Sequence, residues 1–278
     1  METIMKGRIN FPGSSARAVM GIAMALCGLL CVVNPAAGAA NDRPAIDPRA
    51  DELLKRMGQY LGEAKTFSVT AEVWQDLDLA SGQRVQAGRE LQFQVRRPNR
   101  LRVEVRSTRR NRDLIFDGSG ITLLNRAENF YGTIPTKGSL DEVLDTASDR
   151  FGIAMPLDDF LRSDPYRDLR DKVTAARDIG PVKVMGTPCE HLVFSQDNLD
   201  WQLWIEDGAR PVPRKFVITY KDEPNSPEFT AIFSKWDFTT PLPDFVFKFE
   251  PPPGAAQIAV SEIKAKNEAK NPSHKTEK

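Results

Sequence analysis

The stretch from residue 190 to residue 206, "EHLVFSQDNLDWQLWIE", decides the fold, because it has the pattern of two β-strands joined by a tight turn. Asp197 and Asn198 stand at its middle, and both residue types favour two-residue hairpin turns. This turn predicts three cross-strand pairs on one face, Phe194–Trp201, Leu192–Leu203 and Glu190–Ile205, and three on the other, Val193–Gln202, His191–Trp204 and Cys189–Glu206. The first face is mainly apolar, so we expect it to face a core and the second to lie on the outside of a sheet.

Apolar and polar residues alternate in the same way through much of the chain. This period of two predicts strands at "FSVTAEV" (67–73), "LQFQV" (91–95), "LRVEV" (101–105), "LIFDGSGITLL" (114–124, two strands about a turn at 117–120) and "NFYGTI" (129–134). Further strands are predicted from near Thr174 to Phe249. Many strands joined by short turns indicate one large antiparallel sheet.

Helical periodicity is confined to a few short segments. An amphipathic helix is predicted to begin at Asp47–Pro48, and a second follows the capping box formed by Ser139 and Glu142. Two shorter helical turns begin at Pro156 and Asp164. We therefore expect an α+β fold. In this fold an N-terminal helix and a short helical insertion plug the concave face of a strongly curved antiparallel sheet, a shape that tends to leave an apolar cavity.

The ends of the chain have a different composition from its middle. Basic residues, an apolar run at 18–33 and the small residues of "AAGAA" predict a cleaved secretory signal peptide at 1–39 and a periplasmic location. The competing interpretation is a membrane anchor, but the apolar run is shorter than the roughly 20 residues of a membrane span, so we expect no stable span after cleavage. Residues 40–252 are predicted to form one domain, and the charged residues 253–278 a disordered tail.

Charge argues against nucleic acid as a partner. The chain carries 38 basic and 38 acidic residues, so it has no net positive charge for a phosphate backbone. Arginines are concentrated between Arg84 and Arg112, but Arg100, Arg102 and Arg106 alternate with apolar residues and therefore form the outer face of one strand. We expect these arginines to be solvated or paired within the molecule. A contact with lipid head groups or an envelope polymer is the alternative.

Cys189 and His191 are the residues that most resemble a catalytic or metal-binding pair. Side chains two apart on a strand lie about 6.5–7 Å from each other, which is too far for one to activate the other. Two ligands are also too few for a zinc site. We expect no catalytic residues, metal or cofactor, and no enzyme activity. Cys189 should be a free thiol beside His191 on the outer face, where Glu206 would disfavour its thiolate form.

Glu190 is the one acidic residue that the hairpin places on the apolar face. Its charge needs a partner, and Arg214, on the next predicted strand, is the nearest cation by register. We therefore predict an ion pair between Glu190 and Arg214.

The motifs "LIFDGSGITLL", "NFYG" and "GTPCEHLVFS…DWQLWIEDGARPVPRKFVITY" resemble those of predicted periplasmic proteins that contain domain of unknown function 2092. These are similar to the superfamily of lipoprotein localisation factors, the LolA/LolB-like proteins. The resemblance covers about residues 47–252. It implies a half-barrel whose concave face is plugged by helices around an apolar cavity, and functions that are not catalytic.

We hypothesise that the protein binds an acyl chain, a lipid or a lipoprotein-like apolar ligand in this cavity. The candidate lining residues, which could instead simply pack the core, are Leu91, Phe93, Leu101, Val103, Phe116, Leu192, Phe194, Trp201, Leu203, Phe216 and Ile218. The alternative is an envelope adaptor or sensor that binds a partner protein through its outer face without cargo. Trp74, Trp204 and Trp236 favour this alternative, because each is predicted on the polar side of its strand.

Overall fold

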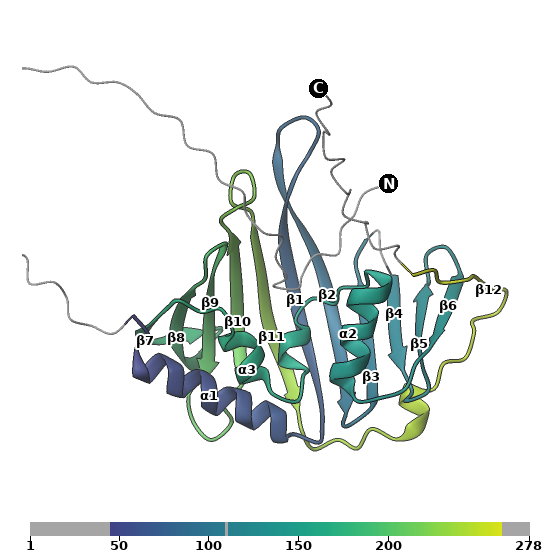
Figure 1. Cartoon of the computed structure of the whole chain (residues 1–278), viewed down its shortest axis with the longest axis horizontal. Coiled ribbons are helices and arrows are strands. Elements are labelled where there is room, and N and C mark those ends of the chain that lie inside the picture. The colour runs from purple at the N-terminus through teal and green to yellow at the C-terminus, as the bar shows by residue number, and fades with distance from the viewer. Residues whose placement is uncertain (1–44, 109–110, 263–278) are drawn as a thin grey trace, which may run out of the picture.

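A computed structural model describes residues 45–108 and 111–262. Within them the chain forms one open, curved sheet with the strand order β12-β6-β5-β4-β3-β2-β1-β11-β10-β9-β8-β7 (Figure 1). The strands are β1 (Thr66–Asp78), β2 (Arg84–Arg96), β3 (Arg100–Arg106), β4 (Asn111–Phe116), β5 (Gly120–Asn125), β6 (Phe130–Pro135), β7 (Ala175–Val184), β8 (Thr187–Ser195), β9 (Leu199–Glu206), β10 (Pro213–Tyr220), β11 (Glu228–Asp237) and β12 (Ala256–Gln257). All neighbours are antiparallel except β12 and β6. The predicted fold class is confirmed, whereas the predicted signal peptide lies outside the described residues.

The helices α1 (Pro48–Glu63), α2 (Leu140–Phe151) and α3 (Pro165–Arg170) and the short 3-10 helix η1 (Asp158–Phe160) lie on the concave face of the sheet. Their starts follow the expected signals. Asp47 and Ser139 cap α1 and α2 with their side chains, and Glu142 completes the capping box. In Figure 1, α1 and α3 cross the β7–β11 side of the sheet, and α2 lies in front of β2 and β3.

The central hairpin has the register that its sequence predicts. Phe194 lies opposite Trp201, Glu190 opposite Ile205 and Cys189 opposite Glu206. Both Phe194 and Trp201 are buried, so the apolar face of this hairpin is the core face.

The predicted ion pair between Glu190 and Arg214 is wrong. The register of β9 and β10 shifts between Pro213 and Lys215, and this irregularity places Arg214 beside Glu206, with 2.8 Å between Arg214 Nε and Glu206 Oε2. Glu190 instead accepts a hydrogen bond of 2.9 Å from Arg49 of α1. The cation for the core face therefore comes from a helix and not from the next strand.

The segment after β11 is irregular, in contrast to the strands predicted up to Phe249. Pro241 and Pro243 lack the N–H groups that a strand would donate, so β11 ends at Asp237. The chain then runs along the lower end of the sheet in Figure 1 to the 3-10 helix η2 (Asp244–Phe247) and to β12, which pairs with β6. The chain thus stays attached to the sheet beyond Pro252, where the sequence predicts that the tail begins.

Candidate functional site

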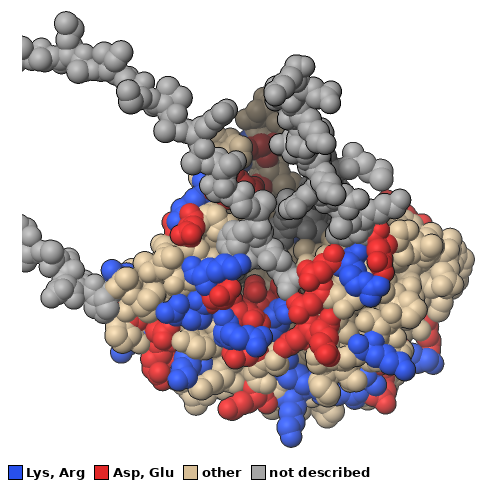
Figure 2. All heavy atoms as spheres, in the orientation of Figure 1, with Lys and Arg blue, Asp and Glu red and all other residues tan. Residues whose placement is uncertain are grey.

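An apolar cavity of about 300 Å³ lies on the concave face of the β2–β6 half of the sheet. Its walls come from residues of these strands and from the segment that follows α2. The lining residues are Leu91, Val103, Val105, Arg112, Asp113, Leu114, Leu123, Leu124, Asn125, Phe130, Gly152, Ile153, Ala154, Met155 and Pro156. Several of these apolar side chains, including Leu114, Leu123 and Ile153, are only half-buried. Figure 2 shows mainly uncharged residues at the right of this face, in front of β5 and β6.

One side of the cavity is formed by residues 152–156, which have neither helical nor strand structure. Gly152 ends α2 in the left-handed conformation (φ 65°), and the next turn begins at Leu157, which is also left-handed (φ 67°). The left-handed region is uncommon for a residue with a side chain. Two reversals of the backbone therefore bracket the segment and hold Ile153 and Met155 against the strands.

The polar groups of the cavity are few. Arg112 of β4 lies directly opposite Asn125 of β5. The two residues are on the concave face, each two positions along its strand from an apolar lining residue, Leu114 or Leu123. The side-chain oxygen of Asn125 accepts hydrogen bonds from the backbone N–H groups of Ala127 (3.1 Å) and Glu128 (3.2 Å). The cavity is therefore a largely apolar space whose polar lining residues are Arg112, Asn125 and Asp113, and the Asp113 carboxylate accepts hydrogen bonds from Arg106 and Arg126.

The predicted lining residues divide into two groups. Leu91 and Val103 line the cavity. The other nine are buried in the core and do not line the cavity: Phe93, Leu101, Phe116, Leu192, Phe194, Trp201, Leu203, Phe216 and Ile218. The same alternation on β3 and β4 could have identified the missed residues Val105 and Leu114, because Val105 follows Val103 by two and Leu114 precedes Phe116 by two. Leu123 lies directly opposite Leu114 on β5. No periodic signal marks residues 153–156.

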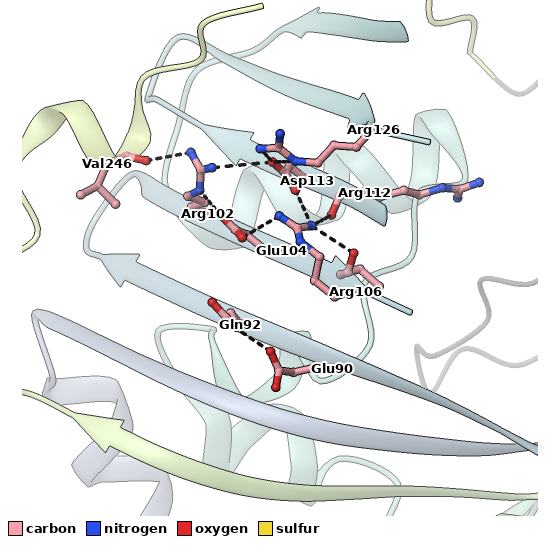
Figure 3. A network of polar contacts seen from close by, with 10 residues as sticks. Glu90, Gln92, Arg102, Glu104, Arg106, Arg112, Asp113, Arg126 and Val246 are labelled. Carbon is pink, nitrogen blue, oxygen red and sulfur yellow. Dashed lines mark hydrogen bonds and ion pairs between the residues drawn. The ribbon is translucent and has the colours of Figure 1, made fainter. Parts of the chain in front are cut away.

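The convex face behind the cavity carries a network of charges (Figure 3). The side chain of Asp113 has no exposed surface, and it accepts hydrogen bonds from Arg106 Nη1 at 2.7 Å and from Arg126 Nε at 2.9 Å. Arg102 Nη2 lies 3.6 Å from the same carboxylate. Glu104 bridges the two arginines of β3, at 2.8 Å from Arg102 and 2.6 Å from Arg106. The predicted pairing of outer-face arginines within the molecule is confirmed for Arg102 and Arg106.

Cys189 and His191 lie on the convex face of the other half and have separate partners. Cys189 is a buried free thiol that packs with Trp204 and Val217 and contacts the carbonyl oxygen of Thr187. Burial, more than the charge of Glu206, raises the pKa of the Cys189 thiol. The His191 ring stacks on Trp204, with 4.1 Å between ring centroids, and its Nε2 lies 3.0 Å from Gln202. Burial lowers the pKa of His191. This geometry gives no thiolate–imidazole pair.

The adaptor hypothesis predicted three outward-facing tryptophans, Trp74, Trp204 and Trp236, but these residues do not form an exposed surface. His191 and Lys215 cover Trp204, which is 9% exposed. Trp236 lies within an irregularity of the β1–β11 register and packs with Phe67 and Phe233, so its predicted place on the polar side is wrong. Trp74 is 43% exposed. The adaptor hypothesis therefore keeps one of its three supporting residues.

Metal-binding clusters and membrane-spanning helices are both absent from the described part of the chain. Between residues 45 and 262, apart from 109–110, no three His, Cys, Asp or Glu side chains are grouped so that they could hold a metal ion. The helices in the same residues are too short or too polar to cross a membrane.

One family model matches the chain over residues 50–261, and its description is "Predicted periplasmic protein (DUF2092)". Among curated proteins, none matches the sequence.

Three similar solved structures have low identities and low TM-scores. An uncharacterised conserved protein from Thermus thermophilus is 14% identical, with a TM-score of 0.45, and the match covers 76% of this chain and 99% of that one. Lipoprotein LppX from Mycobacterium tuberculosis is 13% identical, with a TM-score of 0.43 and coverages of 68% and 96%. The LolA superfamily protein NE2245 from Nitrosomonas europaea is 10% identical, with a TM-score of 0.37 and coverages of 72% and 97%. At these TM-scores the likeness does not indicate a ligand.

Proposed function

The chain belongs to the DUF2092 family of predicted periplasmic proteins, and from this premise we propose that it is a non-catalytic periplasmic protein that binds an acyl chain or a similar apolar ligand. The cavity under residues 152–156 is the proposed binding site. The observation that carries this proposal is an apolar cavity of about 300 Å³ on the concave face of the β2–β6 half.

The size and the walls of the cavity favour a small apolar ligand. Its volume is about twice the ~150 Å³ of an engineered apolar cavity that holds benzene, and it is at the lower end of the ~300–1,000 Å³ range of ligand pockets. Leu114, Leu123 and Ile153 are half-buried in its walls. A ligand that covered them would remove further apolar surface from water, at about 25 cal/mol for each Å².

Native mass spectrometry of protein purified from its own cell envelope tests the proposal. We expect a bound mass that organic extraction releases as a molecule with an acyl chain. Leu123→Trp should fill part of the cavity and reduce the bound fraction at least tenfold, because the larger side chain occupies the space of the ligand.

The matched control is Val85→Trp, which adds a tryptophan of the same size to an exposed position of β2 outside the cavity. This variant should retain the ligand. Protein that carries no apolar molecule and binds no acyl-chain probe would contradict the proposal, and so would equal ligand loss in both variants.

A further inference from the structure

We propose that the ligand is a single-chain amphiphile with an anionic head group, and that Arg112 and Asn125 bind this head group at the wall of the cavity. The inference rests on the proposed function, because it assumes that the cavity holds the chain of the ligand. It adds the charge of the ligand and the number of its chains.

Arg112 differs from the neighbouring arginines in the direction of its side chain. It lies opposite Val105 and Asn125 in the sheet and lines the cavity, whereas Arg102, Arg106 and Arg126 surround Asp113 on the convex face. Figure 3 shows the guanidinium group of Arg112 pointing away from this network. The carboxylate nearest to Arg112 in the sequence, Asp113, is thus engaged by other cations on the opposite side of the sheet.

The guanidinium group of Arg112 has no acidic partner among residues 45–108 and 111–262. Among the described residues, the side-chain hydrogen bond that reaches Arg112 ends on its backbone carbonyl oxygen, which accepts from Arg106 Nη1 at 3.2 Å. Arg112 is half-buried and lies beside apolar side chains, where a charge is less well hydrated than in bulk water. An unpaired cation in this position favours an anion from outside the protein.

Asn125 supplies a second donor directly across the strand pair. Its oxygen is used by the turn at 127–128, which leaves the NH₂ group without a hydrogen-bond partner in the described part of the chain. Side chains that face each other across antiparallel strands have Cβ atoms about 4.5–5.5 Å apart. A guanidinium group and an amide NH₂ at that spacing can donate together to one carboxylate or one phosphate group.

The volume limits the number of chains. About 300 Å³ is close to the smallest volume of a ligand pocket. Arg112 lines the same cavity as the apolar side chains of Leu114 and Leu123. We therefore expect one chain inside the cavity, with its charged end at Arg112 and Asn125.

Isothermal titration of the whole mature protein with three probes tests this inference. The probes are decanoate, 1-decanol at the same chain length, and acetate as the head group without a chain, all below their aggregation limits and at pH 8. Decanoate should bind the wild-type protein at least about tenfold more tightly than decanol, the gain expected from hydrogen bonds to a charged group. Acetate should show no binding at millimolar concentration.

Two variants separate the local effect from the overall charge. Arg112→Gln should lose the preference for decanoate and keep the affinity for decanol, which also shows that the variant is folded. Arg126→Gln removes a positive charge from the convex face of the neighbouring strand and should keep the preference. Equal binding of decanoate and decanol to the wild-type protein, or tight binding of acetate, would overturn the inference but leave the proposed function standing. Absence of binding by decanoate and decanol alike would contradict both proposals.

Discussion

The two halves of the sheet are covered by helices on the same face, but they are filled differently. In the β7–β11 half, α1, α3 and η1 lie over an aromatic core in which Trp201 stacks on Phe194 and contacts Phe216. Phe160 of η1 meets Phe216 edge to face, with 5.2 Å between the ring centroids. In the β2–β6 half, α2 and the segment that follows it lie over mainly aliphatic side chains and leave the cavity.

The convex faces of the two halves differ as well. Behind the packed half, Cys189, Trp204 and Val217 form a small apolar cluster. Behind the hollow half lie the charges around Asp113. The two halves therefore differ on both faces, with an aromatic core and an apolar convex cluster in one half and a cavity and paired charges in the other.

The largest predicted effect is the loss of stability when a buried side chain is truncated to alanine. Trp201→Ala should lower the free energy of unfolding by about 3–5 kcal/mol, because it removes a fully buried aromatic ring from a tightly packed region. Leu123→Ala in the cavity wall should lower it by only about 1 kcal/mol, because Leu123 is half-buried beside an existing space. Urea unfolding measures both values, and equal losses would show that the two halves are packed alike.

The next effect concerns the charges behind the cavity. Asp113→Asn should lower the free energy of unfolding by about 2 kcal/mol, because it removes a buried anion that pairs with Arg126 and that shares Arg106 with Glu104. High salt should reduce the difference only partly, since this carboxylate has no exposed surface.

Asp200→Asn provides the control in the packed half. Asp200 pairs with Lys221 at 2.9 Å, but both side chains are more than a third exposed. We expect a loss of at most about 0.5 kcal/mol. A loss as large as that of Asp113→Asn would break the distinction between the convex faces.

The smallest predicted effect is a pH dependence in the packed half. Burial lowers the pKa of His191 in the folded protein below the value of 6.5 that it has in the unfolded chain. As the pH falls, the unfolded chain therefore binds a proton at His191 before the folded protein does. The neutral His191 ring therefore contributes to the stability of the fold above about pH 6.5, and this contribution is lost as the pH falls from 6.5 through the pKa of the folded protein. The slope of the unfolding free energy between about pH 7 and pH 5 should therefore be smaller in His191→Gln than in wild type, and unchanged in His274→Gln. If the slope in His191→Gln equalled that of the wild type, the prediction that folding lowers the pKa of His191 would be wrong.

The alternation of residues was sufficient to predict the sheet, because local pairing depends on the turn and on the period of two. The hairpin around Asp197 and Asn198 has the predicted register, and the helices begin at the predicted caps. The partner of Glu190 was not predictable in this way. Arg214 is displaced by an irregularity in its strand, and Arg49 comes from a helix far away in the sequence.

The position of the cavity also depends on information that is not local. Trp201 and Leu91 both face inward as predicted. They have the same pattern in the sequence, although Trp201 is packed in the core and Leu91 lines the cavity. The difference depends on which helix covers each strand and on the size of its side chains. Residues 153–156 follow no period, so only the folded structure shows that they line the cavity.

The pairing of β1 with β11 has a consequence for the order of folding. Strands β1–β6 and β7–β11 each pair with their neighbours in sequence, whereas the β1–β11 contact joins the first strand to one near the end of the domain. Closing so long a loop is slow compared with forming hairpins, so we expect the two groups of strands to form first and to join last. Until they join, β1 and β11 are open edges at which another chain could pair. The interval before β1 and β11 pair is therefore the time at which this protein is most exposed to aggregation.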